Sequence, residues 1–236
     1  MPRTARIVAT NYPHHITQRG NYRQRIFAED TEYDIYLKWL GKYADKYKLD
    51  ILAYCLMPNH VHFAAIPGEP DSLAKTFNAC HMRYSQYFNK KNDITGHLWQ
   101  GRFYSCVMDE RHLYAVARYI ENNPVRARLV KEAWDWNWSS ARAHTDRDRE
   151  KGRIKLKDIA DYIKVDDWEE YLKKRKGVKS SFYTLHRGRK GVKSSFYTLH
   201  RNKINLLHHV KTITNRISRS VVSCDEPGKA PGKDFF

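Results

Sequence analysis

Two apolar runs that follow each other almost directly constrain the fold of this chain more than any other feature. Residues 49–57 and 60–66 are separated only by Pro58-Asn59. A turn this short between two strand-like runs predicts an antiparallel hairpin. The first run is rich enough in apolar residues to lie in the centre of a sheet. The sequence therefore predicts a sheet that contains this hairpin.

The flanking segments supply the other elements. Residues 12–19 are strand-like and are ended by Gly20-Asn21, and residues 97–108 contain a fourth strand. Residues 30–48, with Asp30 or Thr31 as the expected N-cap, and residues 72–91 predict two helices. The order β-α-β-β-α-β is that of a ferredoxin-like or RRM-like α+β sandwich, in which two helices cover one face of an antiparallel sheet.

A third helix is predicted after the last strand. Asp109 is its expected N-cap, and the helix should end near Asn123, because Pro124 disfavours helical geometry in the residue before it. The second face of the sheet is open to this helix or to a ligand.

Composition predicts a soluble, cytoplasmic protein. Charged residues make up 29% of the 236 residues, and no apolar stretch approaches the roughly 18 residues of a membrane span. The N-terminus lacks the apolar stretch of a secretory signal, so no membrane partner is expected. The four cysteines lie far apart without a C-x-x-C pair, which indicates reduced thiols rather than a disulfide scaffold or a zinc ribbon.

Positive charge is concentrated near the C-terminus. The net charge is +17, yet residues 171–224 alone hold 14 Lys and Arg and no acidic residue. Within this stretch, residues 175–187 recur unchanged as residues 189–201, which indicates a recent tandem duplication. This tail is either a basic DNA-binding arm or a stretch read in a shifted frame. We expect a catalytic body over residues 1–145, a helical extension over 146–174, and a poorly ordered basic tail over 175–236.

A His-x-His pair opens the second strand of the hairpin. Side chains alternate along a strand, so His60 and His62 face one side of the sheet and Val61 faces the other. Two imidazoles one strand repeat apart can share one divalent ion and leave coordination positions open. Taken alone, the pair is also compatible with hydrogen bonding at the sheet surface. His14 and His15 are alternative ligands, but they are adjacent and face opposite ways.

The third helix adds a tyrosine and an amide. Tyr119 and Asn123 are four residues apart, so they share one flank of the predicted apolar stripe, while Tyr114 falls on the opposite flank. A tyrosine beside such a stripe is by default a packing residue. Its position one turn before the amide, downstream of a His-x-His strand, makes Tyr119 a candidate nucleophile.

These residues resemble the HUH (His-hydrophobic-His) single-tyrosine transposases, and within them the REP-associated tyrosine transposases. The similarity extends over about residues 5–145, in the family's order, and the tail matches nothing in it. It is carried by five stretches: His15–Asn21, Tyr54–His62, Leu98–Phe103, Arg118–Ala127 and Trp136–Ser140.

The resemblance implies a site and a reaction. Tyr119 would be the nucleophile, and His60, His62 and Asn123 would hold Mg²⁺ or Mn²⁺, although ligand softness alone favours zinc for two histidines. The reaction would be single-stranded DNA cleavage and strand transfer through a 5′-phosphotyrosine, next to palindromes folded as hairpins. Candidate phosphate contacts are Arg19, Arg102, Arg118, Arg126 and Arg128.

Some alternatives stay open at this stage. The chain could be a noncatalytic RRM-like nucleic-acid binder, or a metal-dependent nuclease that uses water, with Tyr119 structural. The oligomeric state is expected to be a monomer or a homodimer.

Overall fold

The computed structural model describes residues 7–147, 154–162 and 164–174. The predicted tail, with its repeated segment, lies outside the described residues. Within the described part of the chain, no helix is long and apolar enough to cross a bilayer.

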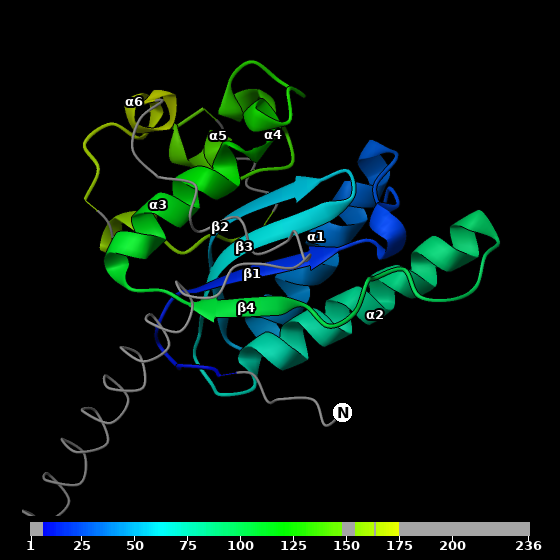
Figure 1. The fold of residues 1–236 in the computed structure, drawn as a ribbon. Coiled ribbons are helices and arrows are strands. Elements are labelled where there is room, and N and C mark those ends of the chain that lie inside the picture. Colours follow the sequence, from blue (N-terminus) through cyan, green and yellow to red (C-terminus); the bar gives the residue numbers. More distant parts are fainter. Residues whose placement is uncertain (1–6, 148–153, 163, 175–236) are drawn as a thin grey trace, which may run out of the picture. The chain divides into compact units, whose positions relative to one another are not determined.

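A four-stranded antiparallel sheet forms the centre of the fold (Figure 1), in the order β2-β3-β1-β4. This is the strand order of the ferredoxin-like sandwich, so the predicted fold class is confirmed. The strands are β1 (His14–Arg19), β2 (Leu49–Met57), β3 (His60–Pro67) and β4 (Tyr104–Val107).

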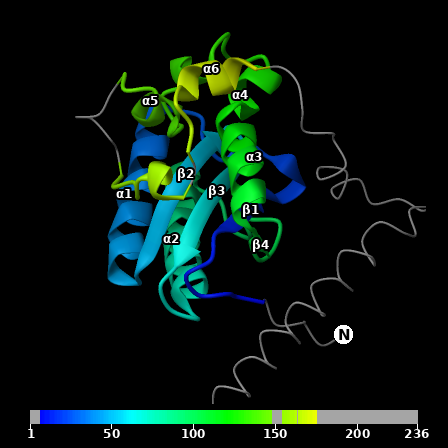
Figure 2. The same ribbon diagram turned by 90° about the vertical axis from the view of Figure 1, so that its left-hand side faces the viewer.

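Helices cover both faces of the sheet (Figure 2). Helices α1 (Asp30–Lys46) and α2 (Ser72–Asn92) cover one face, and α3 (Glu110–Glu121) packs on the other. Shorter elements follow α3 or lie in connections: η1 (Asn21–Arg23), α4 (Asn123–Arg126), η2 (Ala133–Asp135), α5 (Ala141–His144), η4 (Ile159–Asp161) and α6 (Trp168–Lys173).

The predicted hairpin is confirmed, but the expectation that its first strand lies in the centre of the sheet is wrong, because β2 is an edge strand. Its apolar run reflects instead that both of its faces are covered. Alternate residues of β2 enter the core under α1 and α2 or the core under α3. An irregularity between Ile51 and Ala53 shifts the register, so Leu52 and Ala53 both join the α3 side. An almost continuous apolar run is what such a doubly covered strand requires.

One boundary, the start of α1, differs from the expectation, and the structure narrows two others. Helix α1 is capped by Glu29 in a capping box with Glu32, not by Asp30 or Thr31. Strand β4 is only four residues long, because Leu98 and Trp99 pack against the core before it begins. Helix α3 begins after the predicted cap Asp109, whose side chain accepts from the His112 amide, but it ends at Glu121. The chain then turns and starts α4, with Pro124 in its first turn.

The Trp-rich segment after α4 completes the sheet edge. Strand β2 is an edge strand, and residues 138–140 run along it. The Leu56 amide donates to the Trp138 carbonyl at 2.9 Å, and the Ser140 amide donates to the Tyr54 carbonyl at 3.0 Å. Trp134 and Trp138 of this segment are buried, and the covered edge is protected from pairing with other chains.

Gly20 follows β1 where backbone and side chains approach too closely for a larger residue. A Cβ there would lie 2.6 Å from the Gln24 carbonyl oxygen and 2.7 Å from Ile26 Cγ2. Gly101, by contrast, has nothing within 4 Å of the equivalent position. Gly20 is needed because the turn after β1 leaves no space for a side chain.

We therefore predict that Gly20→Ala lowers the free energy of unfolding by about 1–3 kcal/mol, because neighbouring atoms must move apart. Gly101→Ala is the matched control and should change it by less than about 0.5 kcal/mol. Denaturant unfolding of the two variants measures both. Equal stabilities would show that the turn relaxes freely around a methyl group.

Candidate active site

Helix α3 is placed by an apolar stripe that packs on the sheet. Leu113, Val116, Ala117 and Ile120 are all buried, in one cluster with Leu52, Ala64 and other residues of β2 and β3. Because the stripe recurs over two helical turns, it fixes which side of α3 faces the sheet and therefore where the two flanks of the helix lie. Tyr119 lies on one flank, toward His62, and Tyr114 lies on the other, against Tyr171. Asn123 was predicted to share the flank of Tyr119 on one helix, but α3 ends at Glu121 and Asn123 begins α4.

The His-x-His pair faces α3. His60 and His62 leave β3 on the α3 side, while Val61 enters the core under α1 and α2. The two imidazole centroids are 4.9 Å apart, and the Tyr119 ring meets the His62 ring edge-on with centroids 5.6 Å apart. The structure thus brings together a helix residue and two strand residues that are more than 50 positions apart in sequence.

A third histidine joins them from β1. The Nε2 atom of His15 lies 3.2 Å from Nδ1 of His62, and its ring centroid is 6.4 Å from that of Tyr119. Its neighbour His14 points to the other side, where its Nδ1 lies 2.8 Å from the Tyr12 carbonyl. Burial lowers the pKa of His14 despite this hydrogen bond, so His14 is a neutral packing residue. Adjacent residues do face opposite ways, and His15 is the one that faces the site.

Asn123 lies just after the end of α3, the helix that carries Tyr119. It is the first residue of α4, and its amide nitrogen donates to the carbonyls of Tyr119 at 3.0 Å and Ile120 at 3.3 Å. Both partners are acceptors, so the NH₂ group must face them and the amide oxygen must point elsewhere. These bonds satisfy carbonyls that a helix end leaves without intrahelical partners.

The donors suit a small metal site. His60 Nδ1 lies 2.6 Å from the Asn59 side-chain oxygen, and His62 Nδ1 faces His15. Such partners orient an imidazole and direct its Nε2 to a metal. No three His, Cys, Asp or Glu side chains form a metal cluster among the described residues. A metal here would be held by two imidazoles and the Asn123 oxygen, with its other positions open.

The candidate arginines occupy different surroundings. Arg19 is opposite His60 in the β1–β3 register, so both side chains leave the same face. Arg102 lies in the loop before β4, which hydrogen-bonds to β1 through the Gln100 amide and the Arg19 carbonyl. Arg128 is exposed after α4, with a positive φ of 58°.

Two arginines contact tyrosine rings instead. The Arg126 guanidinium lies 4.6 Å from the Tyr119 ring centroid, directly beside the site. The Arg118 guanidinium lies 4.9 Å from the ring of Tyr171, on the flank of α3 that faces α6. Arg118 is therefore the candidate that the structure places away from the histidines and Tyr119.

A second tyrosine shares this face of the sheet. Tyr104 pairs with Thr17, which in turn pairs with His62. Partial burial, with a contribution from neighbouring Cys106, raises the pKa of Tyr104 to about 12. A phenol that is harder to ionise is a poorer nucleophile, which disfavours Tyr104 in that role.

In this fold a tyrosine on α3 faces the His-x-His pair on β3. Residues 8–123 match the family described as IS200-like transposases. This match covers 116 of the 236 residues and confirms the resemblance found from the motifs.

Other comparisons are weaker. A structure described as a REP-associated tyrosine transposase bound to a REP hairpin is 20% identical, with a TM-score of 0.49 over 70% of this chain and 99% of that chain. A candidate transposase of Deinococcus radiodurans R1 is 22% identical, with a TM-score of 0.36 over 51% of this chain and 97% of that chain. No curated protein matches the sequence significantly.

We predict that Asn123→Ala lowers the free energy of unfolding by about 1–2 kcal/mol, since the Tyr119 and Ile120 carbonyls lose their donor. Asn137→Ala is the control. Asn137 is exposed and only accepts from Arg142, so its loss should change stability by less than about 0.5 kcal/mol. Chemical denaturation compares the two. An Asn123→Ala protein as stable as wild type would contradict the capping role.

Proposed function

We propose that this protein cleaves and rejoins single-stranded DNA through a covalent bond between Tyr119 and a 5′-phosphate. The observation that carries the proposal is the edge-on approach of the Tyr119 ring to His62, 5.6 Å between centroids, across the helix–sheet boundary. The imidazole of His15 also meets the Tyr119 ring edge-on, and His60 lies beside His62.

The step balances without an external energy source. The phenol oxygen of Tyr119 forms a bond to phosphorus, and the bond from phosphorus to the 3′ oxygen breaks. The phenol proton passes to solvent, and the leaving 3′ oxygen takes one up to become a hydroxyl. The phosphodiester energy stays in the tyrosine link, so a 3′-hydroxyl can later reverse the reaction and join a new strand.

The residues around Tyr119 would have different roles in this step. A divalent ion, Mg²⁺ or Mn²⁺, would polarise the scissile phosphate and stabilise the charge that develops there. His60, His62 and the Asn123 oxygen are the residues that would hold it. Arg126 lies over the Tyr119 ring, where its guanidinium would contact a phosphate beside the phenol.

The substrate we propose is a strand next to a short imperfect palindrome folded as a hairpin, which rests on the motif resemblance. Arg19, Arg102 and Arg126 border the site and would contact phosphates. Single-strand binding also needs aromatic stacking. Tyr12 and Tyr104 are exposed enough for it, whereas Phe103 is buried and Trp99 donates to the His81 carbonyl within the body.

Tyr119→Phe tests the nucleophile. With labelled hairpin-bearing DNA and Mn²⁺, we expect wild type to give a covalent protein–DNA band on a denaturing gel, and Tyr119→Phe to give none while folding and binding DNA normally. Tyr114→Phe and Tyr104→Phe should form the band at the wild-type rate. Free cleaved DNA without a band would indicate a water-using nuclease, and intact DNA would indicate a noncatalytic binder.

Metal dependence is tested at the histidines. His60→Ala and His62→Ala should each abolish cleavage and weaken Mn²⁺ binding measured by calorimetry, yet leave hairpin affinity within about threefold, because binding depends mainly on the phosphate backbone. Asn123→Ala should have a smaller effect, since water can replace one neutral ligand. His97→Ala is the control at an exposed loop histidine. Cleavage by either site variant at wild-type rates across a Mn²⁺ titration would exclude the metal role.

A further inference from the structure

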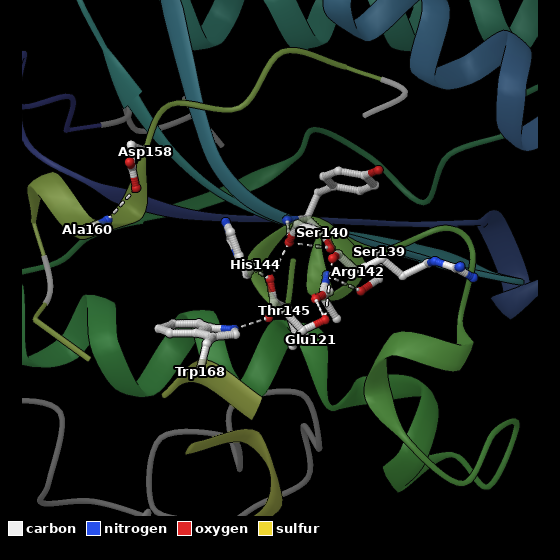
Figure 3. Close-up of polar contacts among 11 residues, drawn as sticks. Glu121, Ser139, Ser140, Arg142, His144, Thr145, Asp158, Ala160 and Trp168 are labelled. Carbon is white, nitrogen blue, oxygen red and sulfur yellow. Dashed lines mark hydrogen bonds and ion pairs between the residues drawn. The ribbon is translucent and has the colours of Figure 1, made fainter. Parts of the chain in front are cut away.

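A fully buried carboxylate lies at the end of α3, the helix that carries Tyr119. Glu121 is two residues after Tyr119, so its side chain points to the opposite flank of α3. It is 0% exposed, and it accepts three hydrogen bonds (Figure 3). Its Oε1 accepts from Ser140 Oγ at 2.5 Å and from His144 Nδ1 at 2.6 Å, and its Oε2 accepts from Trp168 Nε1 at 2.7 Å.

All three donors come from outside the segment that matches the transposase family. That match ends at residue 123, whereas Ser140 and His144 lie around α5 and Trp168 opens α6. We name residues 138–147 and 164–174 the supporting segments. Long separation in sequence and full burial indicate that the network is part of the core rather than a surface contact.

The contact with Glu121 favours the charged form of the His144 imidazole. Burial disfavours the charged imidazole, but the Glu121 carboxylate and its hydrogen bond outweigh burial, and the pKa of His144 is raised. Around them, His144 and Trp168 meet edge-on, with ring centroids 5.4 Å apart. A buried carboxylate with three directional partners has one well-defined position.

Helix α6 makes further contacts along the same flank of α3. The Tyr171 hydroxyl donates to the Tyr114 carbonyl at 3.2 Å, and the Asn122 side chain donates to the Leu172 carbonyl at 3.2 Å. The Arg118 guanidinium lies over the Tyr171 ring. One flank of α3 is thus attached to the supporting segments, and the other presents Tyr119 to His62.

We propose that the supporting segments position the nucleophile of this protein, and that Glu121 is the positioning residue through which they hold α3. This inference rests on the proposed role of Tyr119. An apolar stripe tolerates small rotations of a helix about its axis, and such a rotation moves the phenol of Tyr119 along the sheet. Hydrogen bonds to Glu121 restrict that rotation from the far side of the helix.

The test uses the full chain with two variants. Glu121→Gln replaces the carboxylate that accepts the hydrogen bonds, and Trp168→Phe removes the indole N–H that donates one of them. Tyr84→Phe is the matched control, because it deletes the buried hydrogen bond from Tyr84 to the Ile26 carbonyl on the opposite side of the sheet. Single-turnover adduct formation at saturating DNA separates the rate from the affinity. Amide hydrogen exchange without DNA reports on α3 itself.

We expect both network variants to slow adduct formation by about tenfold or more, with hairpin affinity within about twofold, because small misplacement of a reacting group is costly. The amides of residues 113–121 should exchange at least about tenfold faster, while those of β2 and β3 keep their protection. Tyr84→Phe should leave the adduct rate and the exchange of α3 amides near wild type, even if it lowers the melting temperature as much as the network variants do.

Unchanged α3 exchange in both network variants would overturn the proposal, as would a Tyr84→Phe protein that loses as much adduct rate as they do. A wild-type protein that forms no adduct would overturn the proposed function instead. In that case the exchange measurement alone still decides whether Glu121 holds α3.

Discussion

The contact between the apolar stripe of α3 and the second face of the sheet is the interaction on which the site depends. It buries Leu113, Val116, Ala117 and Ile120, and each fully buried side chain of the larger types contributes about 1.5–3 kcal/mol. Without this contact the His-x-His pair on β3 would face solvent and Tyr119 would have no fixed neighbour. The same burial that stabilises the fold therefore assembles the residues of the proposed reaction.

Much of this arrangement could be predicted because it follows from local periodicity. The period of two along β3 placed His60 and His62 on one face, and the period of 3.6 along α3 placed Tyr119 opposite Tyr114. The hairpin boundaries followed from an apolar run interrupted by Pro58-Asn59. Each of these inferences needs only residues within one element, and patterns within an element are the part of a fold that the sequence displays directly.

Features that depend on contacts between distant segments could not be predicted from the sequence. Whether His14 or His15 faces α3 depends on the register of β1 against β3, and a shift of one residue would exchange them. Glu121 gave no signal, since a glutamate in a helix is usually solvated and its partners lie 19 to 47 residues further along. The surroundings of Arg118 depend on α6 in the same way, because its contact with the Tyr171 ring joins residues 53 positions apart in the sequence.

The two kinds of contact on α3 have different physical consequences. Hydrophobic burial is not directional, so the stripe holds the helix on the sheet but defines its rotation only loosely. Hydrogen bonds to a buried carboxylate are directional, and leaving one unmade is costly. The proposed reaction, in which one phenol oxygen must lie beside a phosphate, would need both, because the first supplies the stability and the second supplies the orientation. Residues 138–147 and 164–174 supply both kinds of support within the described part of the chain, because the first covers the edge of β2 and both contribute partners to Glu121 at the buried end of α3.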